Sequence, residues 1–175
     1  MGRHLMSAAY TLVFAYGSNM CTRRMCERVA SARVLATGFV IQRRIVFHKR
    51  SQDGSAKADA QFTGTANDCV WGVIYRLPTD HKPQLDAYEF LGVGYDEESV
   101  EVMLPFGKVQ AWMYVARREA IDDELLPYTW YHDLVVHGAQ EHHLPDRYVN
   151  QLRAFPTCHD SDVDRAARHR LLLDT

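Results

Sequence analysis

The sequence has no apolar run that approaches the roughly 18 residues of a membrane-spanning helix. This absence excludes a helical membrane protein, and we expect no membrane partner. The first ten residues carry Arg3 and His4 and no long apolar stretch, so we predict no secretory signal and a cytoplasmic location. Met6 is a candidate native start. We therefore expect residues 1–6 to be a leader, either disordered or left over from expression.

Paired metal-binding and nucleotide-binding motifs are also missing. None of the cysteines forms the C-x-x-C pair typical of zinc sites, and we expect reduced thiols in a cytoplasmic protein. There is no Gly-rich phosphate loop, no H-E-x-x-H motif and no Ser–His–Asp order. His142 and His143 lack further ligands at matching spacing, so we assign them a structural role. We expect no metal and no cofactor. The four cysteines are Cys21, Cys26, Cys69 and Cys158.

Charge is unevenly distributed along the chain, although the net charge is only −2. Residues 1–57 contain ten Lys/Arg and two acidic residues, and residues 58–175 contain ten and twenty. A basic half can indicate nucleic-acid binding. These arginines, however, are scattered and lack the aromatic interleaving of a stacking platform. We predict a solvated basic face paired with the acidic half, and no nucleic-acid partner.

The pattern of apolar residues predicts one α+β domain over residues 7–175, because strands fill the first two thirds and helices follow. A chain of 175 residues can bury a core without disulfides or metals. Gly72, inside an apolar strand, indicates close approach of another backbone. Residues 51–60 are polar and are expected to form a loop. The expected strands are 10–16, 33–41, 44–49, 69–77, 99–104 and 108–116; the expected helices are 22–29, 80–89, 127–141, 145–155 and 163–173.

Two places carry candidate chemistry. At Tyr16–Met20 a strand ends, Gly17 permits an unusual backbone angle, and a helix begins with Asn19 as a possible cap. Free amides in such a turn can hold a carboxylate or an oxyanion; a purely structural turn is the alternative. Glu89 ends an amphipathic helix beside apolar residues, where burial and the helix dipole disfavour the ionised form and suit a proton carrier. A surface carboxylate is the alternative there.

Three blocks of sequence resemble the γ-glutamylcyclotransferase, or AIG2-like, family. The first is F-A-Y-G-S-N-M at Phe14–Met20. The second is V-W-G-V-I-Y-R-L at Val70–Leu77, followed by Q-L-D-A-Y-E at Gln84–Glu89. The third is Y-x-x-x-V-x-x-G-A at Tyr131–Ala139, followed by L-P-x-x-Y at Leu144–Tyr148. The blocks occur in the family's order and span most of the chain.

This resemblance implies a small closed mixed β-barrel with packed helices and a cofactor-free enzyme, monomeric or homodimeric. Its activity would be the cyclisation of a small-molecule γ-glutamyl amide to 5-oxoproline, with Glu89 as general acid and base. It also implies that Tyr131 lines the substrate pocket. The γ-glutamyl group would be held by Phe14, Ala15, Tyr16, Gly17, Ser18 and Asn19.

Two departures from the family pattern leave the substrate open. Phe90 replaces the Gly that usually follows the catalytic Glu, and Asp96–Glu98 form an acidic segment near the expected exit of the leaving group. That segment would suit a cationic leaving amine. The alternatives are therefore a cyclotransferase for γ-glutamyl amines or a γ-glutamylated biosynthetic intermediate, and a non-catalytic module that binds small ligands.

Overall fold

The computed structural model describes residues 9–174, so the leader expected at residues 1–6 lies outside the described residues. The strands are β1 (Tyr10–Ala15), β2 (Arg33–Ile41), β3 (Arg43–Arg50), β4 (Ala56–Phe62), β5 (Cys69–Pro78), β6 (Tyr95–Leu104) and β7 (Gly107–Ala116). The α-helices are α1 (Thr22–Arg28), α2 (Lys82–Tyr88), α3 (Thr129–Glu141), α4 (Asp146–Arg153) and α5 (Val163–Arg170). The 3₁₀ turns are η1 (Ser18–Met20), η2 (Thr79–His81) and η3 (Arg118–Ala120).

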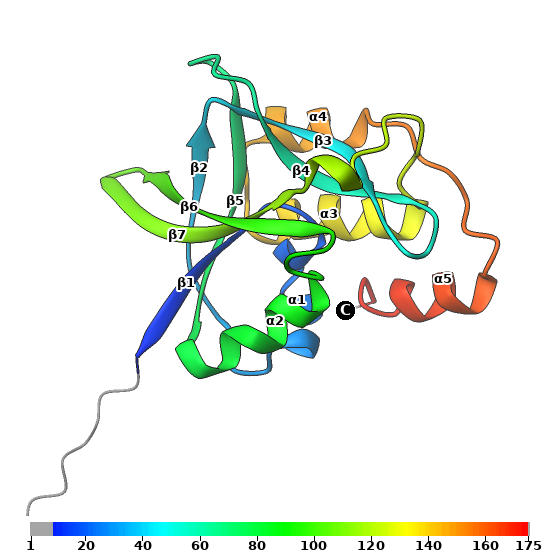
Figure 1. Ribbon diagram of the computed structural model, residues 1–175, viewed down its shortest axis with the longest axis horizontal. Helices are drawn as coiled ribbons and strands as arrows, with labels where there is room; N and C mark the ends of the chain where they lie inside the picture. Colours follow the sequence, from blue (N-terminus) through cyan, green and yellow to red (C-terminus); the bar gives the residue numbers. More distant parts are fainter. Residues whose placement is uncertain (1–8, 175) are drawn as a thin grey trace, which may run out of the picture.

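Five strands close into a barrel in the order β1-β5-β2-β6-β7, with the helices packed around it (Figure 1). β1 and β7 close the barrel as a parallel pair at Val13 and Trp112, while the other neighbouring strands run antiparallel. The sheet is therefore mixed, and the expected α+β fold with a small closed mixed β-barrel is confirmed. Among residues 9–174, no helix combines the length and apolar character needed to cross a bilayer.

Gly72 lies where β5 and β1 approach each other most closely. A Cβ atom at this position would lie 2.4 Å from the carbonyl oxygen of Ala15 and 2.7 Å from Cζ of Phe14. The ring of Phe14 thus occupies the space above Gly72 and is itself buried. The glycine is needed for this contact, as its position inside an apolar strand indicated.

The prediction of a loop over residues 51–60 holds for residues 51–55 and is wrong for the rest, because β4 begins at Ala56. β3 and β4 form a separate antiparallel pair that lies outside the barrel sheet. Ala56, Ala58 and Ala60 are buried at every second position, which is the period of a strand. Small alanines between polar residues give a weak strand signal, since alanine is depleted in strands.

α3 holds the segment that follows β1 in place. Gly138 packs directly on this segment, where an added Cβ would lie 2.5 Å from the backbone nitrogen of Cys21. The glycine of the Y-x-x-x-V-x-x-G-A block therefore permits close contact between α3 and Met20–Cys21. These two residues directly follow the Y-G-S-N turn, which is formed by Tyr16–Asn19. The capping residue of α1 is Cys21 rather than Asn19, because Asn19 lies inside the turn η1 and its side chain has another partner.

Candidate active site

A cavity of about 210 Å³ opens beside the end of β1. It is bounded by the Y-G-S-N turn, by the end of α2, by β3 and β4, and by α3. All the predicted site residues line it, although they are far apart in the sequence. They are Phe14, Ala15, Tyr16, Gly17, Ser18, Asn19, Glu89 and Tyr131. The structure thus brings the predicted residues together, and the role of each stays a prediction.

The turn after β1 presents backbone amides that no described residue uses. The N–H groups of Gly17 and Ser18 donate no hydrogen bond to the part of the chain that the structure describes. Gly17 has φ −104° and ψ −144°, so its backbone lies outside the ordinary helix and strand regions without being left-handed. The space around it is also tight, because an added Cβ would lie 3.2 Å from Oη of Tyr131. The two amides can therefore bind a carboxylate or an oxyanion in the cavity.

Glu89 is held by two side chains that come from the first helical segments. Its Oε1 accepts hydrogen bonds from Nδ2 of Asn19 at 2.8 Å and from Nη1 of Arg28 at 2.6 Å. Arg28 also donates to Oδ1 of Asn19 at 2.9 Å, so the three side chains fix one another. Within the described residues Oε2 of Glu89 accepts no hydrogen bond. One carboxylate oxygen is thus anchored and the other is free to take a proton.

The backbone directly after Glu89 has a conformation that favours glycine. Phe90 has φ +52°, in the left-handed region. Its N–H donates to the carbonyl oxygen of Ala87, and the N–H of Leu91 donates to that of Asp86. These two bonds form the Schellman motif that ends α2, in which the left-handed residue is commonly Gly. The motif makes Glu89 the residue that caps α2, and Glu89 lines the cavity.

Phe90→Gly is expected to be more stable than Phe90→Ala, because only glycine relieves the left-handed backbone. A left-handed backbone costs an L-residue roughly 1–2 kcal/mol, and glycine avoids this cost but loses more entropy on folding. Phe90 is 44% exposed, so both substitutions give up the packing of the buried part of the ring, and only the backbone cost differs between them. We expect Phe90→Gly to exceed Phe90→Ala by up to about 1 kcal/mol, with a melting temperature higher by a few degrees.

The control for this variant is Val93→Gly, which removes an exposed apolar side chain from the same loop at a residue without a positive φ. Thermal melts of all three variants and of the wild type separate the two effects. Phe90→Gly that is no more stable than Phe90→Ala would show that the left-handed backbone at Phe90 carries no cost.

Tyr131 contributes a hydroxyl group at the floor of the cavity. Its Oη accepts a hydrogen bond from the N–H of Ala58 at 3.0 Å, and no described residue accepts the hydroxyl proton. Burial raises the pKa of Tyr131, so the phenol stays protonated. The hydroxyl is therefore available to donate a hydrogen bond to a ligand.

Several cationic residues of the cavity were missed by the sequence analysis. Arg24, Arg28, Lys49 and Lys57 line the cavity against two acids, Asp53 and Glu89. The arginines lie four residues apart on α1, which places both on one face of the helix. The lysines come from the neighbouring strands β3 and β4. All four belong to the basic half of the chain, which we had interpreted as a solvated face.

Asp96–Glu98 do not border the cavity, which corrects the expectation of an acidic exit for the leaving group. None of these residues lines the cavity that the described residues form. Glu97 pairs with Lys82, and Glu98 pairs with Arg43. The acidic segment therefore neutralises cations on neighbouring elements.

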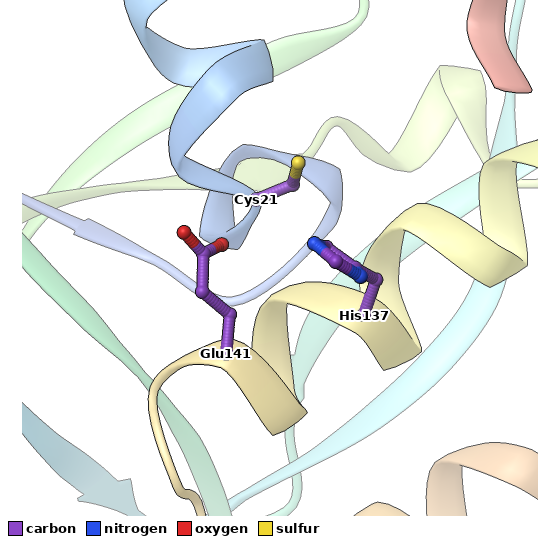
Figure 2. A group of neighbouring side chains, drawn as sticks. All are labelled: Cys21, His137 and Glu141. Atoms are coloured by element: carbon purple, nitrogen blue, oxygen red, sulfur yellow. The ribbon is translucent and has the colours of Figure 1, made fainter. Parts of the chain in front are cut away.

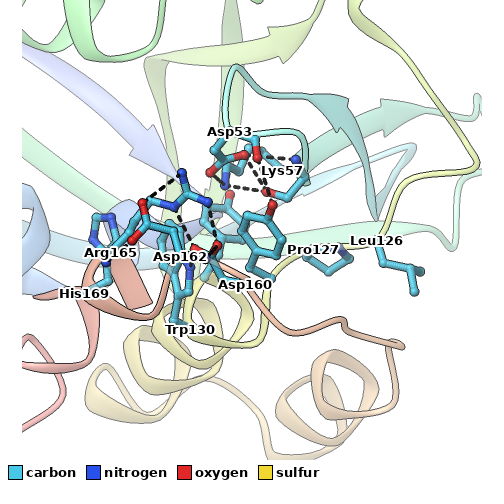
Figure 3. Close-up of polar contacts among 12 residues, drawn as sticks. Asp53, Lys57, Leu126, Pro127, Trp130, Asp160, Asp162, Arg165 and His169 are labelled. Atoms are coloured by element: carbon cyan, nitrogen blue, oxygen red, sulfur yellow. Dashed lines mark hydrogen bonds and ion pairs between the residues drawn. The ribbon is translucent and has the colours of Figure 1, made fainter. Parts of the chain in front are cut away.

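The C-terminal segment forms one wall of the cavity (Figure 3). The ring of His169, from α5, stacks on Trp130 of α3 with 3.9 Å between ring centroids. Asp160 fixes this arrangement, since it accepts hydrogen bonds from Nε1 of Trp130 at 2.8 Å and from Nε of Arg165 at 2.7 Å. Burial and the charge of Arg24 lower the pKa of His169 to about 4, so its ring is neutral near pH 7.

A second cluster lies behind the Y-G-S-N turn (Figure 2). Cys21, at the start of α1, faces His137 and Glu141 of α3, and one donor atom from each lies within 4.8 Å of the others. These donors could hold a metal ion, which the cysteine spacing did not indicate. The thiol would have to ionise first, and burial raises the pKa of Cys21. Glu141 is already engaged, since its Oε2 accepts a hydrogen bond from the N–H of Thr22 at 3.0 Å.

We expect full activity to persist after exhaustive treatment with EDTA. Neither the predicted proton carrier Glu89 nor the turn amides belong to the Cys21 cluster. None of the three residues of that cluster lines the cavity. The measurement is the rate of 5-oxoproline release before and after chelation, with metal analysis of the protein. Activity that is lost to EDTA and restored by one metal would contradict the cofactor-free mechanism. If Cys21→Ser abolished that restoration, the metal would be assigned to this cluster.

Comparisons with known proteins agree with the fold and the motifs. A sequence model described as the AIG2-like family matches residues 69–152. No curated protein matches the sequence. The structure of a gamma-glutamyl cyclotransferase matches with a TM-score of 0.80 and 22% identity, over 95% of this chain and 100% of that chain.

Two further solved structures share the architecture. An uncharacterized protein from Homo sapiens matches with a TM-score of 0.78 and 23% identity, over 91% of this chain and 98% of that chain. A gamma-glutamyl cyclotransferase specific to glutathione, from yeast, matches with a TM-score of 0.51 and 13% identity, over 95% and 96% of the two chains. At these identities the structural matches establish a common fold. Together with the sequence match over residues 69–152, they confirm the resemblance of this chain to the γ-glutamylcyclotransferase, or AIG2-like, family.

Proposed function

We propose that this chain is a γ-glutamylcyclotransferase that converts a γ-glutamyl amide to 5-oxoproline and releases the amine. One observation carries the proposal: the free oxygen of the Glu89 carboxylate and the unused amides of Gly17 and Ser18 line one cavity. A proton acceptor and a site for negative charge are the two groups that an amide cyclisation requires.

In the proposed reaction the substrate's α-amine attacks its own γ-carbonyl carbon. Glu89 takes the proton of the α-ammonium group and thereby frees the lone pair. The new C–N bond closes the five-membered ring, and the carbonyl oxygen becomes an oxyanion. As the oxyanion collapses, the original amide bond breaks and Glu89 returns its proton to the leaving nitrogen. The ring nitrogen gives up its second proton to the released amine, which leaves as an ammonium ion. No electron acceptor is consumed.

Chain residues support each step of this reaction. Asn19 and Arg28 fix the orientation of the Glu89 carboxylate, which helps hold the reacting groups in position. The turn amides and the Tyr131 hydroxyl offer hydrogen bonds to the oxyanion or to the α-carboxylate. Because nucleophile and electrophile belong to one molecule, a cavity that folds the substrate can supply much of the rate.

A screen of γ-glutamyl amides tests the proposal. Each candidate is incubated with the protein, and release of 5-oxoproline is followed by mass spectrometry. The panel should include amides of amino acids, polyamines and the lysine side chain, together with glutathione. Release of 5-oxoproline by the wild type, and not by heat-inactivated protein, is the expected result. Absence of release from every amide, with binding retained, would favour a non-catalytic module.

A further inference from the structure

The Cys21 cluster contains a buried thiol without a partner. Cys21 is 1% exposed and forms no disulfide, and its Sγ makes no hydrogen bond with the residues that the structure describes. The sulfur lies instead beside the side chains of His137 and Glu141, where α1 begins and α3 ends (Figure 2). A buried free cysteine usually packs as a small apolar residue. Apolar packing does not explain why both of these neighbours are groups that bind metal ions.

The imidazole of His137 also has no partner. This residue is half-buried, and neither of its ring nitrogens makes a hydrogen bond or an ion pair with a described residue. His132, on the same helix, shows the contrast, since its Nε2 lies 2.7 Å from the carbonyl oxygen of Leu152. His137 and Glu141 are four residues apart, so they are neighbours on one face of α3. A ring nitrogen that no other group uses therefore lies next to the thiol and the carboxylate.

Glu141 has one carboxylate oxygen that is held and one that is free. Its Oε2 accepts a hydrogen bond from the N–H of Thr22 at 3.0 Å and lies 3.7 Å from Nε2 of His142. No Lys or Arg in the described part of the chain pairs with this carboxylate, and its Oε1 accepts no hydrogen bond there. The bond to Thr22 orients the carboxylate, as the outer partners of metal ligands do. The other oxygen is available to a cation.

Gly138 brings the two sides of the cluster together. An added Cβ at this position would lie 2.5 Å from the backbone nitrogen of Cys21, so a larger residue would push α3 away from the thiol. With glycine, one donor atom from each of Cys21, His137 and Glu141 lies within 4.8 Å of the others. Ligand atoms on a tetrahedral zinc ion are roughly 3.4–3.6 Å apart, as the usual bond lengths require. Small rotations of the side chains can close the remaining gap.

The chemistry of the three donors favours zinc. A thiolate and an imidazole suit Zn²⁺, whereas Mg²⁺ and Ca²⁺ prefer oxygen ligands. One thiolate, one carboxylate and a neutral imidazole also balance the two positive charges of the ion. Burial raises the pKa of the Cys21 thiol, but a thiol that coordinates a metal ion loses its proton, which passes to water. With three protein ligands, the fourth position of a tetrahedral ion is open to a water molecule.

We propose that Cys21, His137 and Glu141 form a zinc site that fastens the start of α1 to the end of α3. Cys21 follows the Y-G-S-N turn after a single residue, Met20, so the bound ion would hold this turn in place from outside the cavity. None of the three ligands lines the cavity. The ion therefore stabilises the turn and takes no part in the reaction, and the inference does not depend on the proposed function.

Titration of the chelated, reduced protein with zinc chloride tests this inference. Calorimetry is expected to show one tightly bound ion per chain. Cobalt(II) in place of zinc is expected to give the near-ultraviolet absorption of a thiolate–cobalt bond. With free zinc at a hundredfold excess over Kd, the melting temperature should rise by roughly 5–10 °C. Magnesium chloride should have none of these effects, because Mg²⁺ binds oxygen ligands.

Variants assign the ion to the cluster. Cys21→Ser retains the shape of the side chain and removes the thiolate, and His137→Gln removes the imidazole at a half-buried position. Each is expected to lower zinc affinity by more than roughly 100-fold, because loss of an outer-shell partner alone costs roughly 10–100-fold. Cys21→Ser should also lose the cobalt absorption. Cys158→Ser and His159→Gln are the matched controls outside the cluster, and both should bind zinc as the wild type does.

The outcomes separate the zinc site from the proposed function. Zinc affinity that is equal in the wild type, Cys21→Ser and His137→Gln would overturn the proposal, as would a wild type without tight binding or without the cobalt absorption. If Cys21→Ser fails to fold, His137→Gln decides. Release of 5-oxoproline is recorded in parallel and should not change when zinc is removed. A protein that binds zinc through Cys21 and releases no 5-oxoproline would contradict the proposed function alone.

Discussion

Glu89→Gln is expected to lower kcat by roughly 10²–10⁴-fold with a much smaller change in substrate affinity. Glutamine keeps the length of the side chain, and its amide oxygen can still accept hydrogen bonds from Asn19 and Arg28. It cannot take the proton of the substrate's ammonium group. In the proposed function, substrate recognition rests on the turn amides and Tyr131, which the substitution leaves in place. The variant therefore loses a function that is needed only as the reaction proceeds.

The measurement pairs 5-oxoproline release with substrate Kd for the wild type and Glu89→Gln. Glu101→Gln is the matched control, because Glu101 is a carboxylate on β6 outside the cavity. At the C-terminal end of a helix, the dipole alone would make the variant with the neutral Gln side chain slightly more stable than the wild type with its carboxylate. The structure instead gives Arg28 as an ion-pair partner, so we expect the melting temperature to fall slightly. Normal turnover in a folded Glu89→Gln variant would remove this residue as the proton carrier.

Gly17→Val is expected to lower activity by roughly 10²–10³-fold or more, the loss typical of one oxyanion donor. Even the first carbon of a side chain at this position would lie 3.2 Å from Oη of Tyr131 and 3.3 Å from Cβ of Ala58. The two further methyl groups of valine would press on both neighbours and cover the turn amides. Because φ of Gly17 is not left-handed, we attribute the expected effect to space.

A graded series tests this explanation. Gly17→Ala adds one carbon that needs only a small shift of its neighbours, and it should retain more activity than Gly17→Val. Both variants should remain soluble, which thermal melts and size-exclusion chromatography would check. Wild-type turnover in folded Gly17→Val would mean that the turn has only a structural role.

The strands β1 and β5 were predictable because they carry the most apolar runs of the sequence, whereas their closure into a barrel was implied by the family resemblance. β1 and β5 read as buried strands, and Gly72 marked their close contact. β4 escaped prediction because its buried positions are alanines, whose small side chains give little hydrophobic signal. The position of Glu89 at the end of a helix was also predictable from the sequence, since the amphipathic pattern stops there.

The cationic side of the cavity was not predictable in the same way. Arg28, Lys49 and Lys57 have no apolar periodicity that indicates burial, and scattered cations are usually solvated. Only the folded chain brings Arg28 to Glu89 over a separation of 61 residues. Likewise, Phe90 was visible as a departure from the family pattern, but its left-handed backbone, which favours glycine, follows from how α2 ends.

The wall formed by α5 also bears on the order in which the molecule is made. Among the described elements α5 leaves the ribosome last, so Trp130 and Arg24 are synthesised well before the ring of His169 can cover them. The barrel strands, which end at Ala116, are all synthesised before α5, so one side of the cavity stays open until this helix is made. A tag fused directly after α5 would lie next to this wall, whereas a tag at the other end would extend from β1. Protein for kinetic work is therefore better tagged at the N-terminus.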